Sequence, residues 1–556
     1  MPVPDERPCL ADRLAPWLGV VVVVAAVAVV VRTLFYGYIL DDTTVIRANP
    51  VVQSWHGLRS AWTHPYWAEQ GGATRSGLYR PLLIAMFTVI WNAGHRFALW
   101  FHLFAIAAHG TASWLVWRML RRAVQPWIAF AVALWFAVHP AHVEAIASVA
   151  NVSEVLVAIA AIWLAYALRR AADGAASGTP IGWGAALGMA ALFAAASLIK
   201  ESGFVVPALA AAWAWGWRWP GDRWARWRAG EWVRRWRRPL LLGVVVLIAV
   251  FAARRAVIGG AVSNAAMAAP GLEGLSAWQR AWAMLALGPR VLALLFWPVR
   301  LLPHYGPEVL TAAGPSLVGF ATLVVLAAGV ALAWALARRG DRRLLAATGW
   351  LLIAFLPASN LLVATGQILA ERTLYGASIG AAMVVAWTAS LAVDAARARA
   401  RVPRRVVTAA VFLAIGMAVC RSAFLAAAYT SEWRSHDTLF HYLVAADPEG
   451  YRGHWLLALQ QQAAAHPDSA LHELGRAYVR FHGDRQLTID YTDALLAAGR
   501  PDSAATVASN LMRFPDMRAD SNAVGLYLNA VAQAYGADSA RALAAALAPG
   551  LRRPRP

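Results

Sequence analysis

Residues 17–36 read WLGVVVVVAAVAVVVRTLFY, an apolar run long enough to cross a lipid bilayer as a helix. Similar runs recur along the chain, which has 556 residues, 60% of them hydrophobic and only 14% charged. Soluble domains carry about 25% charged residues. Because backbone groups inside lipid must be satisfied within the protein, this composition predicts an all-α, polytopic membrane helical bundle.

The apolar runs predict about 11 membrane spans. Their approximate bounds are 17–36, 97–117, 127–139, 152–168, 181–199, 204–217, 239–257, 317–337, 344–362, 374–393 and 405–425. Residues 278–297 are also apolar enough to cross, but Pro289 and Arg290 interrupt the middle of this segment. A crossing there would place the later arginine clusters on the wrong side, so we expect an interfacial or re-entrant helix.

Arginines concentrate in every second linker between these runs and account for much of the formal net charge of +20. The clusters begin at Arg118, Arg169, Arg218, Arg338 and Arg397. Loops rich in Lys and Arg stay in the cytoplasm, so the pattern predicts a cytoplasmic N-terminus and places the other linkers outside. Membrane orientation thus explains a positive charge that would otherwise suggest a nucleic-acid partner, and we expect none.

The composition changes near residue 430, where charged residues return and the apolar residues become spaced as on amphipathic helices. We therefore expect a transmembrane domain over residues 1–429, with a first extracytoplasmic loop at 37–80. An extracytoplasmic helical domain over residues 430–556 would follow it.

Three Asp-Ser-Ala triplets recur in this last part, at residues 468–470, 502–504 and 538–540. Their spacing is close to the period of about 34 residues that is typical of tetratricopeptide repeats. The spacing predicts helix pairs that bury their apolar sides by stacking on one another. A generic helical tail with coincidental triplets is the alternative.

Ionisable residues gather at the outer ends of the predicted spans, where an unpaired charge is costly. Asp41 and Asp42 directly follow the first apolar run. Two adjacent carboxylates repel each other, which raises the pKa of one of them or favours binding of a divalent cation. A carboxylate here can accept the proton of an acceptor hydroxyl, or hold a metal ion on a donor phosphate. A helix cap at the membrane boundary is the structural alternative.

The second outer linker contains His139, His142 and Glu144, whose spacing matches no helical zinc motif. We expect these three residues to form a hydrogen-bonding cluster that faces a polar cavity. The other charged residues at span ends are Arg80, Lys200, Glu201, Arg254, Arg255, Glu371 and Arg372. Their basic groups can hold a phosphate, although Lys200 and Glu201 are also consistent with a plain surface ion pair.

An ordered set of short motifs runs through these linkers over about residues 30–440. It comprises Asp41-Asp42, Asn49-Pro50, Tyr79-Arg80-Pro81-Leu82, Phe101-His102-Leu103, Val138 to Ala145, Lys200-Glu201, Trp297-Pro298, Leu356 to Asn360 and Ala370 to Tyr375. The set resembles the transmembrane and tetratricopeptide-repeat O-mannosyltransferases and their bacterial relatives. The resemblance implies a C-type membrane glycosyltransferase fold, with a repeat region that is shorter than in the animal members.

The resemblance also implies an activity. Such an enzyme transfers mannose, with inversion, from a polyprenyl-phosphate carrier to a Ser or Thr hydroxyl of an exported protein, in a bacterial inner membrane. On this resemblance Asp41 matches the base and Asp42 matches a second acidic position. The residues expected to bind the donor phosphate or line the site are Arg80, His139, Glu144, Lys200, Glu201, Arg255, Glu371 and Arg372.

Two other functions are compatible with the sequence. One is a non-catalytic scaffold whose membrane part anchors the repeats for protein assembly, and the other is a transferase acting on a glycolipid. A scaffold has no need for ionisable residues at the span ends, which favours an enzyme. The sequence leaves the sugar, the acceptor and any requirement for a divalent cation open.

Overall fold

The computed structural model describes residues 10–67, 77–173, 180–219, 229–259, 268–310, 314–398 and 403–551. Every regular element among these residues is a helix, as the apolar runs predict. The chain divides into two compact units. The membrane unit comprises Met1–Ala268, Gly274–Leu301 and Thr311–Ser435, and the C-terminal unit comprises Ala269–Glu273, Leu302–Leu310 and His436–Pro556.

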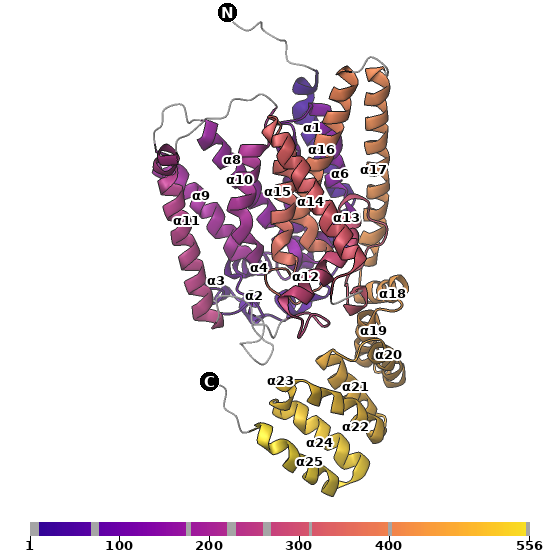
Figure 1. The fold of residues 1–556 in the computed structure, drawn as a ribbon. Coiled ribbons are helices and arrows are strands. Elements are labelled where there is room, and N and C mark those ends of the chain that lie inside the picture. Colours follow the sequence, from indigo (N-terminus) through magenta and orange to yellow (C-terminus); the bar gives the residue numbers. More distant parts are fainter. Residues whose placement is uncertain are drawn as a thin grey trace, which may run out of the picture. The chain divides into compact units, whose positions relative to one another are not determined.

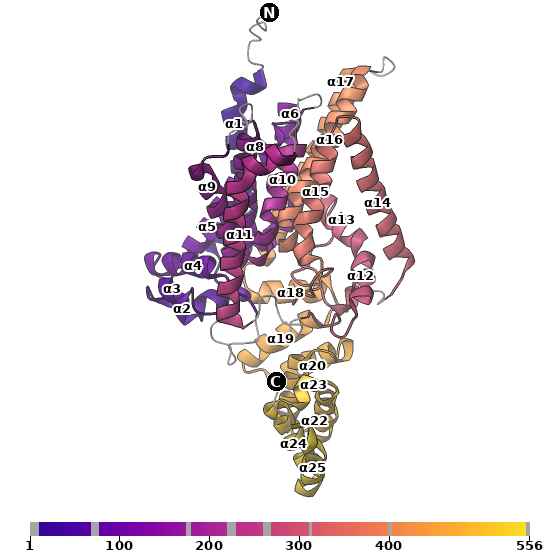
Figure 2. The same ribbon diagram turned by 60° about the vertical axis from the view of Figure 1, so that its left-hand side comes forward.

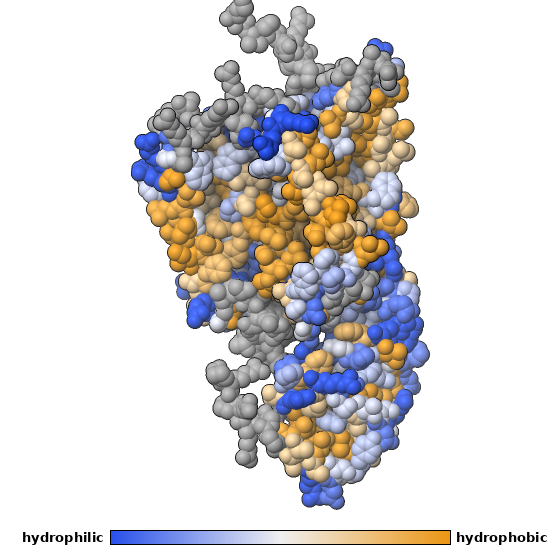
Figure 3. Space-filling view, viewed as in Figure 1, coloured by the Kyte–Doolittle hydropathy of each residue, from blue (hydrophilic) through white to orange (hydrophobic). Residues whose placement is uncertain are grey.

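Six helices in the described part of the membrane unit are long and apolar enough to cross a bilayer. They are α5 (Ala98–Leu120), α8 (Ser153–Asp173), α11 (Ala229–Ile258), α14 (Leu317–Arg338), α16 (Tyr375–Ala398) and α17 (Arg404–Glu432). Helix α6 (Pro126–Ala137) and the segment Pro140–Ala147, which contains α7 (Val143–Ala147), meet at a bend of 49° and form a seventh if they cross together. Figure 3 shows hydrophobic residues across the middle of this unit. The protein is therefore a multi-pass membrane protein.

Four further apolar helices are shorter than a full span. They are α1 (Leu10–Ala28, apolar from Pro16), α4 (Pro81–Ala93), α9 (Trp183–Ile199) and α15 (Arg343–Phe355). The predicted span at 204–217 is α10 (Val206–Gly216), whose 11 residues extend only about 17 Å. Helix α4 lies outside the set of predicted spans, and the total of about 11 crossings stays a prediction.

The segment at 278–297 forms two short helices, α12 (Ala277–Ala286) and α13 (Gly288–Phe296). Pro289 lies in the first turn of α13, where its missing N–H costs no helical hydrogen bond. Each helix extends about 15 Å, half the thickness of the hydrocarbon core. The segment therefore does not form one straight span, in agreement with an interfacial or re-entrant position.

Several helices of the membrane unit end together at what we call the Arg-rich end. The Trp217 indole donates to the carbonyl oxygen of Met119 at 3.1 Å, and Arg169 donates to the Trp217 carbonyl at 2.8 Å. Arg343 donates to the Ala123 carbonyl at 3.0 Å. The C-terminal ends of α5, α8 and α10 therefore meet the start of α15. Figures 1 and 2 both show α8, α9, α10 and α11 side by side.

The opposite end of this unit is reached along α8, whose 21 residues extend about 31 Å. Its first turn carries Glu154, which pairs with Lys200 in one of the loops at this end. Short elements build these loops. They are η2 (Thr43–Arg47), α2 (Pro50–Gln53), α3 (Gly57–Ser60), η3 (Pro140–His142), η4 (Val149–Val152), η6 (Glu201–Val205), η9 (Leu356–Ala358) and η10 (Glu371–Leu374).

The C-terminal unit is a series of short helices. They are α18 (His436–Ala446), α19 (Tyr451–Ala463), α20 (Pro467–Arg480), α21 (Arg485–Ala497), α22 (Pro501–Ser509), α23 (Pro515–Arg518), α24 (Ser521–Tyr535) and α25 (Ala537–Leu551). Trp455, Leu474 and Leu487 form a core shared by three successive helices, α19 to α21. The three Asp-Ser-Ala triplets lie in the first turns of α20, α22 and α25. An aspartate there stabilises the helix, because its negative charge interacts favourably with the positive end of the helix dipole.

Candidate active site

Asp42 fixes the first outer loop against the segment between α7 and α8. Its side chain is fully buried, and its carboxylate accepts hydrogen bonds from four donors. The Ala150 amide and the Ser148 hydroxyl donate to Oδ1 at 2.8 and 3.1 Å, while the amides of Val149 and Ile39 donate to Oδ2 at 3.2 and 3.3 Å. Burial raises the pKa of Asp42 to about 7, although the four donors oppose the shift.

Asp41 has a different environment from its neighbour. It is half-buried, and its carboxylate makes no hydrogen bond or ion pair with the residues that the structure describes. It interacts electrostatically with Glu144 and Arg372. Leu40, which precedes it, has a positive φ of 49°, so the backbone turns sharply before the two carboxylates. The pair is thus split into one carboxylate closed off by donors and one left open.

Glu144 and Arg372 form a buried ion pair between α7 and η10. The Arg372 amide donates to Oε2 of Glu144 at 2.8 Å, and the guanidinium donates to Oε1. The side chain of Glu144 is 1% exposed and that of Arg372 is 11% exposed. Two hydrogen bonds from Arg372 fix the carboxylate of Glu144 in position. They and the charge attraction offset the cost of removing both groups from water.

Glu201 joins two arginines from distant parts of the chain. Arg80 donates to its Oε2 through Nη2 at 2.8 Å and Nε at 3.0 Å, and Arg254 donates to its Oε1 at 3.2 Å. Burial alone would raise the pKa of Glu201, but the two guanidinium groups lower it to about 2. Arg80 also lies over the ring of Tyr66, with 4.7 Å from guanidinium carbon to ring centroid.

Lys200 pairs with Glu154 in the first turn of α8. The distance from Nζ to Oε1 is 2.8 Å, and the two side chains are 13% and 7% exposed. Burial lowers the pKa of Lys200, while the neighbouring Glu154 raises it. Electrostatic interactions also link Arg80 and Arg372 with Glu154.

These residues form one group, which we call the acid–base cluster. Its members are Asp41, Asp42, Arg80, Glu144, Glu154, Lys200, Glu201, Arg254 and Arg372. They come from segments more than 300 residues apart in the sequence and lie at the end of the membrane unit opposite the Arg-rich end. Each of its four cations has a carboxylate partner, so the cluster is electrostatically organised without a ligand.

Two members of this cluster, Arg254 and Glu154, are absent from the set of site residues that the resemblance implied. Arg255 is exposed, whereas Arg254 is buried and pairs with Glu201. Successive helical residues point about 100° apart, so only one of the two arginines can face the cluster. Glu154 was missed altogether, although it is an acidic residue at the start of an apolar run and fits the same rule of costly charges at span ends.

The histidines of the second outer linker and Glu371 lie in the protein interior. His139 is 1% exposed and packs edge to face on Trp135, with ring centroids 5.0 Å apart. His142 is equally buried and shares a hydrogen bond of 2.8 Å with the Ser378 hydroxyl. Both rings therefore lie among buried side chains, and the polar cavity expected beside them stays a prediction. Glu371 is also fully buried.

In the part of the chain that the structure describes, no group of three or more His, Cys, Asp or Glu side chains is placed to hold a metal ion. His139, His142 and Glu144 accordingly do not form a described metal centre. The cluster is instead organised by ion pairs and hydrogen bonds.

Sequence comparison relates the chain to one kind of curated protein. It is 28% identical over 178 residues to protein O-mannosyl-transferase TMTC3 of Mus musculus, covering 32% of this chain and 19% of that protein. It is 31% identical over 175 residues to Tmtc2 of Drosophila melanogaster, covering 31% and 19%. Over 118 residues it is 33% identical to Tmtc1 of the same fly, covering 21% and 14%.

The matched part therefore spans about a fifth or less of the length of these relatives. Neither a family model nor a solved structure matches the chain. The resemblance that the ordered motifs indicated is nonetheless confirmed, because these relatives carry the expected family name.

Proposed function

We propose that this protein is a membrane glycosyltransferase that moves a sugar from a polyprenyl-phosphate carrier to a Ser or Thr hydroxyl of an exported protein. The relatives are named protein O-mannosyltransferases, which supports a protein acceptor and mannose as the sugar. The strongest support in the structure is the position of Asp41. It is an accessible carboxylate, with no hydrogen bond to the described residues, beside ion pairs that are fixed before any substrate binds.

In the proposed reaction Asp41 acts as the general base. The acceptor hydroxyl oxygen attacks C1 of the sugar, and the bond between C1 and the phosphate oxygen breaks. The hydroxyl proton passes to Asp41, and the electron pair of the broken bond leaves on polyprenyl phosphate. Phosphate is a good leaving group, so direct attack with inversion at C1 requires no covalent enzyme intermediate.

Arg372 and Lys200 are the proposed donor-phosphate ligands. An arginine carries five N–H donors and a lysine three, and the ion pairs with Glu144 and Glu154 occupy only some of them. The remaining donors suit a phosphate whose negative charge grows as the sugar leaves. Arg255 is not part of this proposal, because its side chain is exposed, whereas that of Arg254 is buried. Arg254 and Arg80 instead hold Glu201.

Asp42 has a positioning role in this proposal. Its carboxylate is buried under four donors and has no access to an acceptor hydroxyl. By joining the first outer loop to the segment before α8, it determines where Asp41 lies. A cluster on the extracytoplasmic face, an N-terminus in the cytoplasm and a bacterial inner membrane complete the proposed topology.

The C-terminal unit is proposed to be an extracytoplasmic set of tetratricopeptide-like repeats. Helices α20 and α22 both begin with Pro-Asp-Ser-Ala, and their first residues, Pro467 and Pro501, are one 34-residue period apart. A stack of helix pairs offers a groove in which an unfolded acceptor segment can bind. Residues 1–429 would then carry the catalysis and residues 430–556 the acceptor recognition.

The proposal is tested with the purified full chain, polyprenyl-phosphate mannose and a Ser/Thr-rich acceptor peptide. Replacing a general base lowers the rate by about 10²–10⁴-fold, so Asp41→Asn is expected to lose turnover by that factor and keep its thermal stability. The matched control is Glu231→Gln, which neutralises an exposed carboxylate in the first turn of α11, outside both the cluster and the proposed acceptor-recognition domain. Turnover by Asp41→Asn at the wild-type rate would remove Asp41 as the base.

A further inference from the structure

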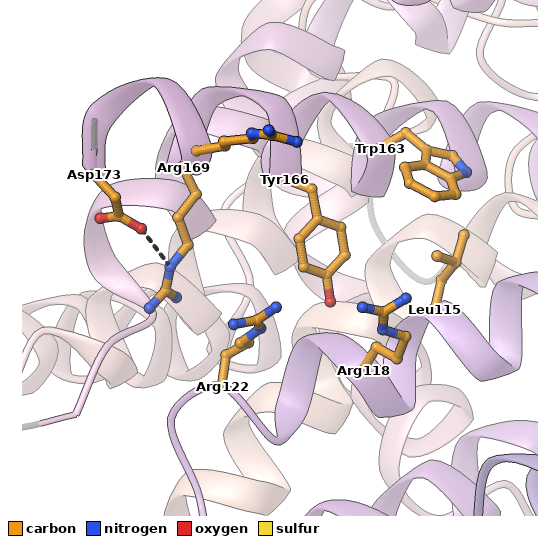
Figure 4. A pocket seen from close by; sticks show the side chains of 8 residues that line it. Leu115, Arg118, Arg122, Trp163, Tyr166, Arg169 and Asp173 are labelled. Atoms are coloured by element: carbon orange, nitrogen blue, oxygen red, sulfur yellow. Dashed lines mark ion pairs between the residues drawn. The ribbon is translucent and has the colours of Figure 1, made fainter. Parts of the chain in front are cut away.

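A cavity of about 370 Å³ lies between α5 and α8 at the Arg-rich end, far from the acid–base cluster. Figure 4 shows side chains from both helices pointing into it. Its wall contains Arg118, Arg122, Arg169 and Arg170, with Trp163, Tyr166, Leu115 and a single acidic residue, Asp173. The volume is within the range of sites that hold small molecules.

The charges around this cavity do not balance. Asp173 is already engaged by Arg169 at 3.6 Å and by Arg218 at 2.6 Å. Arg118, Arg122 and Arg170 form no ion pair with the described carboxylates. The cavity therefore carries a surplus of positive charge that no described side chain neutralises.

Aromatic side chains hold two of these arginines in place. Arg118 lies over the ring of Trp114 at 4.9 Å, and Arg122 lies over the ring of Tyr166 at 5.9 Å. In Figure 4 the Tyr166 hydroxyl points between the guanidinium groups of Arg118 and Arg122. Three groups able to donate hydrogen bonds thus converge on one part of the cavity, as a phosphate group requires.

A second cavity, of about 710 Å³, adjoins the first and shares Trp163, Tyr166 and Arg170 with it. It runs between α8 and α9, where its lining includes Gly182, Ala185, Gly188, Met189 and Leu192. A Cβ atom added at Gly182 or Gly188 would meet no atom within 4 Å. The small residues of α9 therefore leave an open apolar groove beside the arginine cavity.

We propose that the two cavities form one binding site for an anionic phospholipid. The phosphodiester binds Arg118, Arg122 and Tyr166, and an acyl chain lies in the groove between α8 and α9. Basic pockets between membrane helices on the cytoplasmic side are typical sites for anionic headgroups. Membrane orientation alone explains why arginines occur at this end, but not why three of them converge on a cavity that continues as an apolar groove.

The headgroup part of the site is tested by native mass spectrometry of the detergent-purified full chain. We expect the protein to retain phosphatidylglycerol at least tenfold better than phosphatidylcholine. The double variant Arg118→Gln/Arg122→Gln is expected to reduce phosphatidylglycerol retention about tenfold. Each basic residue near an anionic headgroup contributes to the binding free energy, and the variant removes two of them. Arg338→Gln/Arg339→Gln, at the end of α14, removes the same charge from the same end outside the cavity and is expected to change nothing.

The acyl-chain part is tested by filling the groove. Gly188→Leu introduces a side chain into open space, so it should leave thermal stability unchanged and abolish phosphatidylglycerol retention. Gly243→Leu on α11 is the control, because it also meets no atom within 4 Å and is not among the groove-lining residues.

Five results would overturn the assignment. Equal retention of both phospholipids, or an equal loss of retention in Arg338→Gln/Arg339→Gln, would mean that the arginines serve only to orient the chain in the membrane. Wild-type retention by Gly188→Leu would exclude an acyl chain from the groove. Displacement of phosphatidylglycerol by inorganic phosphate, or by polyprenyl phosphate at a tenfold lower concentration, would assign the cavity to another phosphate compound.

Discussion

The two ends of the membrane unit contain the same kinds of charged side chain in opposite states of balance. In the acid–base cluster each of the four cations pairs with a carboxylate, and most of these side chains are nearly inaccessible. At the Arg-rich end, three arginines around one cavity form no ion pair with a described carboxylate. The state of pairing, rather than the number of charges, therefore distinguishes a preorganised site from one that awaits an external anion.

Removal of one carboxylate at each end of the membrane unit should give the largest difference between the two ends, measured as the loss in the free energy of unfolding. Glu201→Gln leaves Arg80 and Arg254 buried without their charged partner, and we expect a loss of about 3–5 kcal/mol in the free energy of unfolding. Asp173→Asn removes a carboxylate that is 49% exposed, and we expect a loss below about 1 kcal/mol. Denaturant titration of both variants in the same detergent measures the two losses.

Equal losses in Glu201→Gln and Asp173→Asn would contradict the proposed difference in charge pairing between the two ends. They would mean that water reaches Glu201 as freely as it reaches Asp173. A stabilising effect of Glu201→Gln would mean that the desolvation cost of the three charges exceeds their mutual attraction.

The acid–base cluster should also respond to pH through Asp42. Its pKa is raised from 3.8 to about 7, so the folded protein binds a proton there that the unfolded chain has lost. The stabilisation from this proton is fully present below pH 4 and is lost as the pH rises towards 7. A shift of this size corresponds to about 2–4 kcal/mol between pH 4 and pH 8.

This pH effect is measured as the unfolding free energy of the wild type and of Asp42→Asn across that range. The variant carries no titrating group at this position, so its stability should lack the decrease that the wild type shows. Asp41→Asn is the control and should keep the decrease, because Asp42 is intact. The same slope in Asp42→Asn and in the wild type would assign the pH dependence to another group.

Much of the fold and of the cluster could be predicted from the sequence, because both follow from the cost of placing unsatisfied polar or charged groups in lipid. Long apolar runs must be helical in lipid, and an ionisable residue at the end of a run needs a partner or water. The rule selected Asp41, Glu144, Lys200 and Arg372, which the structure brings to one end of the membrane unit. It could not give helix lengths, since the 14-residue run at 204–217 folds as an 11-residue helix between two loops.

The sequence could not distinguish adjacent residues of the same type. Asp41 and Asp42 have equal chemistry, and only the turn at Leu40 and the donors of residues 148–150 decide which of them is closed off. Which of two neighbouring side chains faces inward depends on how a helix or turn is rotated against its neighbours. That rotation is set by packing across the whole unit, which no local pattern records.

The arginine pair on α11 gives the smallest predicted effect and the sharpest test of this orientation. Arg254 donates to Glu201 at 3.2 Å and to the Gly77 carbonyl at 3.0 Å, while Arg255 is exposed. Arg254→Gln should therefore cost about 1–2 kcal/mol in the free energy of unfolding, because Glu201 keeps Arg80 as a partner. Arg255→Gln should change the same free energy by less than about 0.5 kcal/mol, as surface substitutions usually do. If Arg255→Gln proved the more damaging of the two, α11 would be rotated from the orientation described. Arg255, which the resemblance implied as a site residue, would then belong to the cluster.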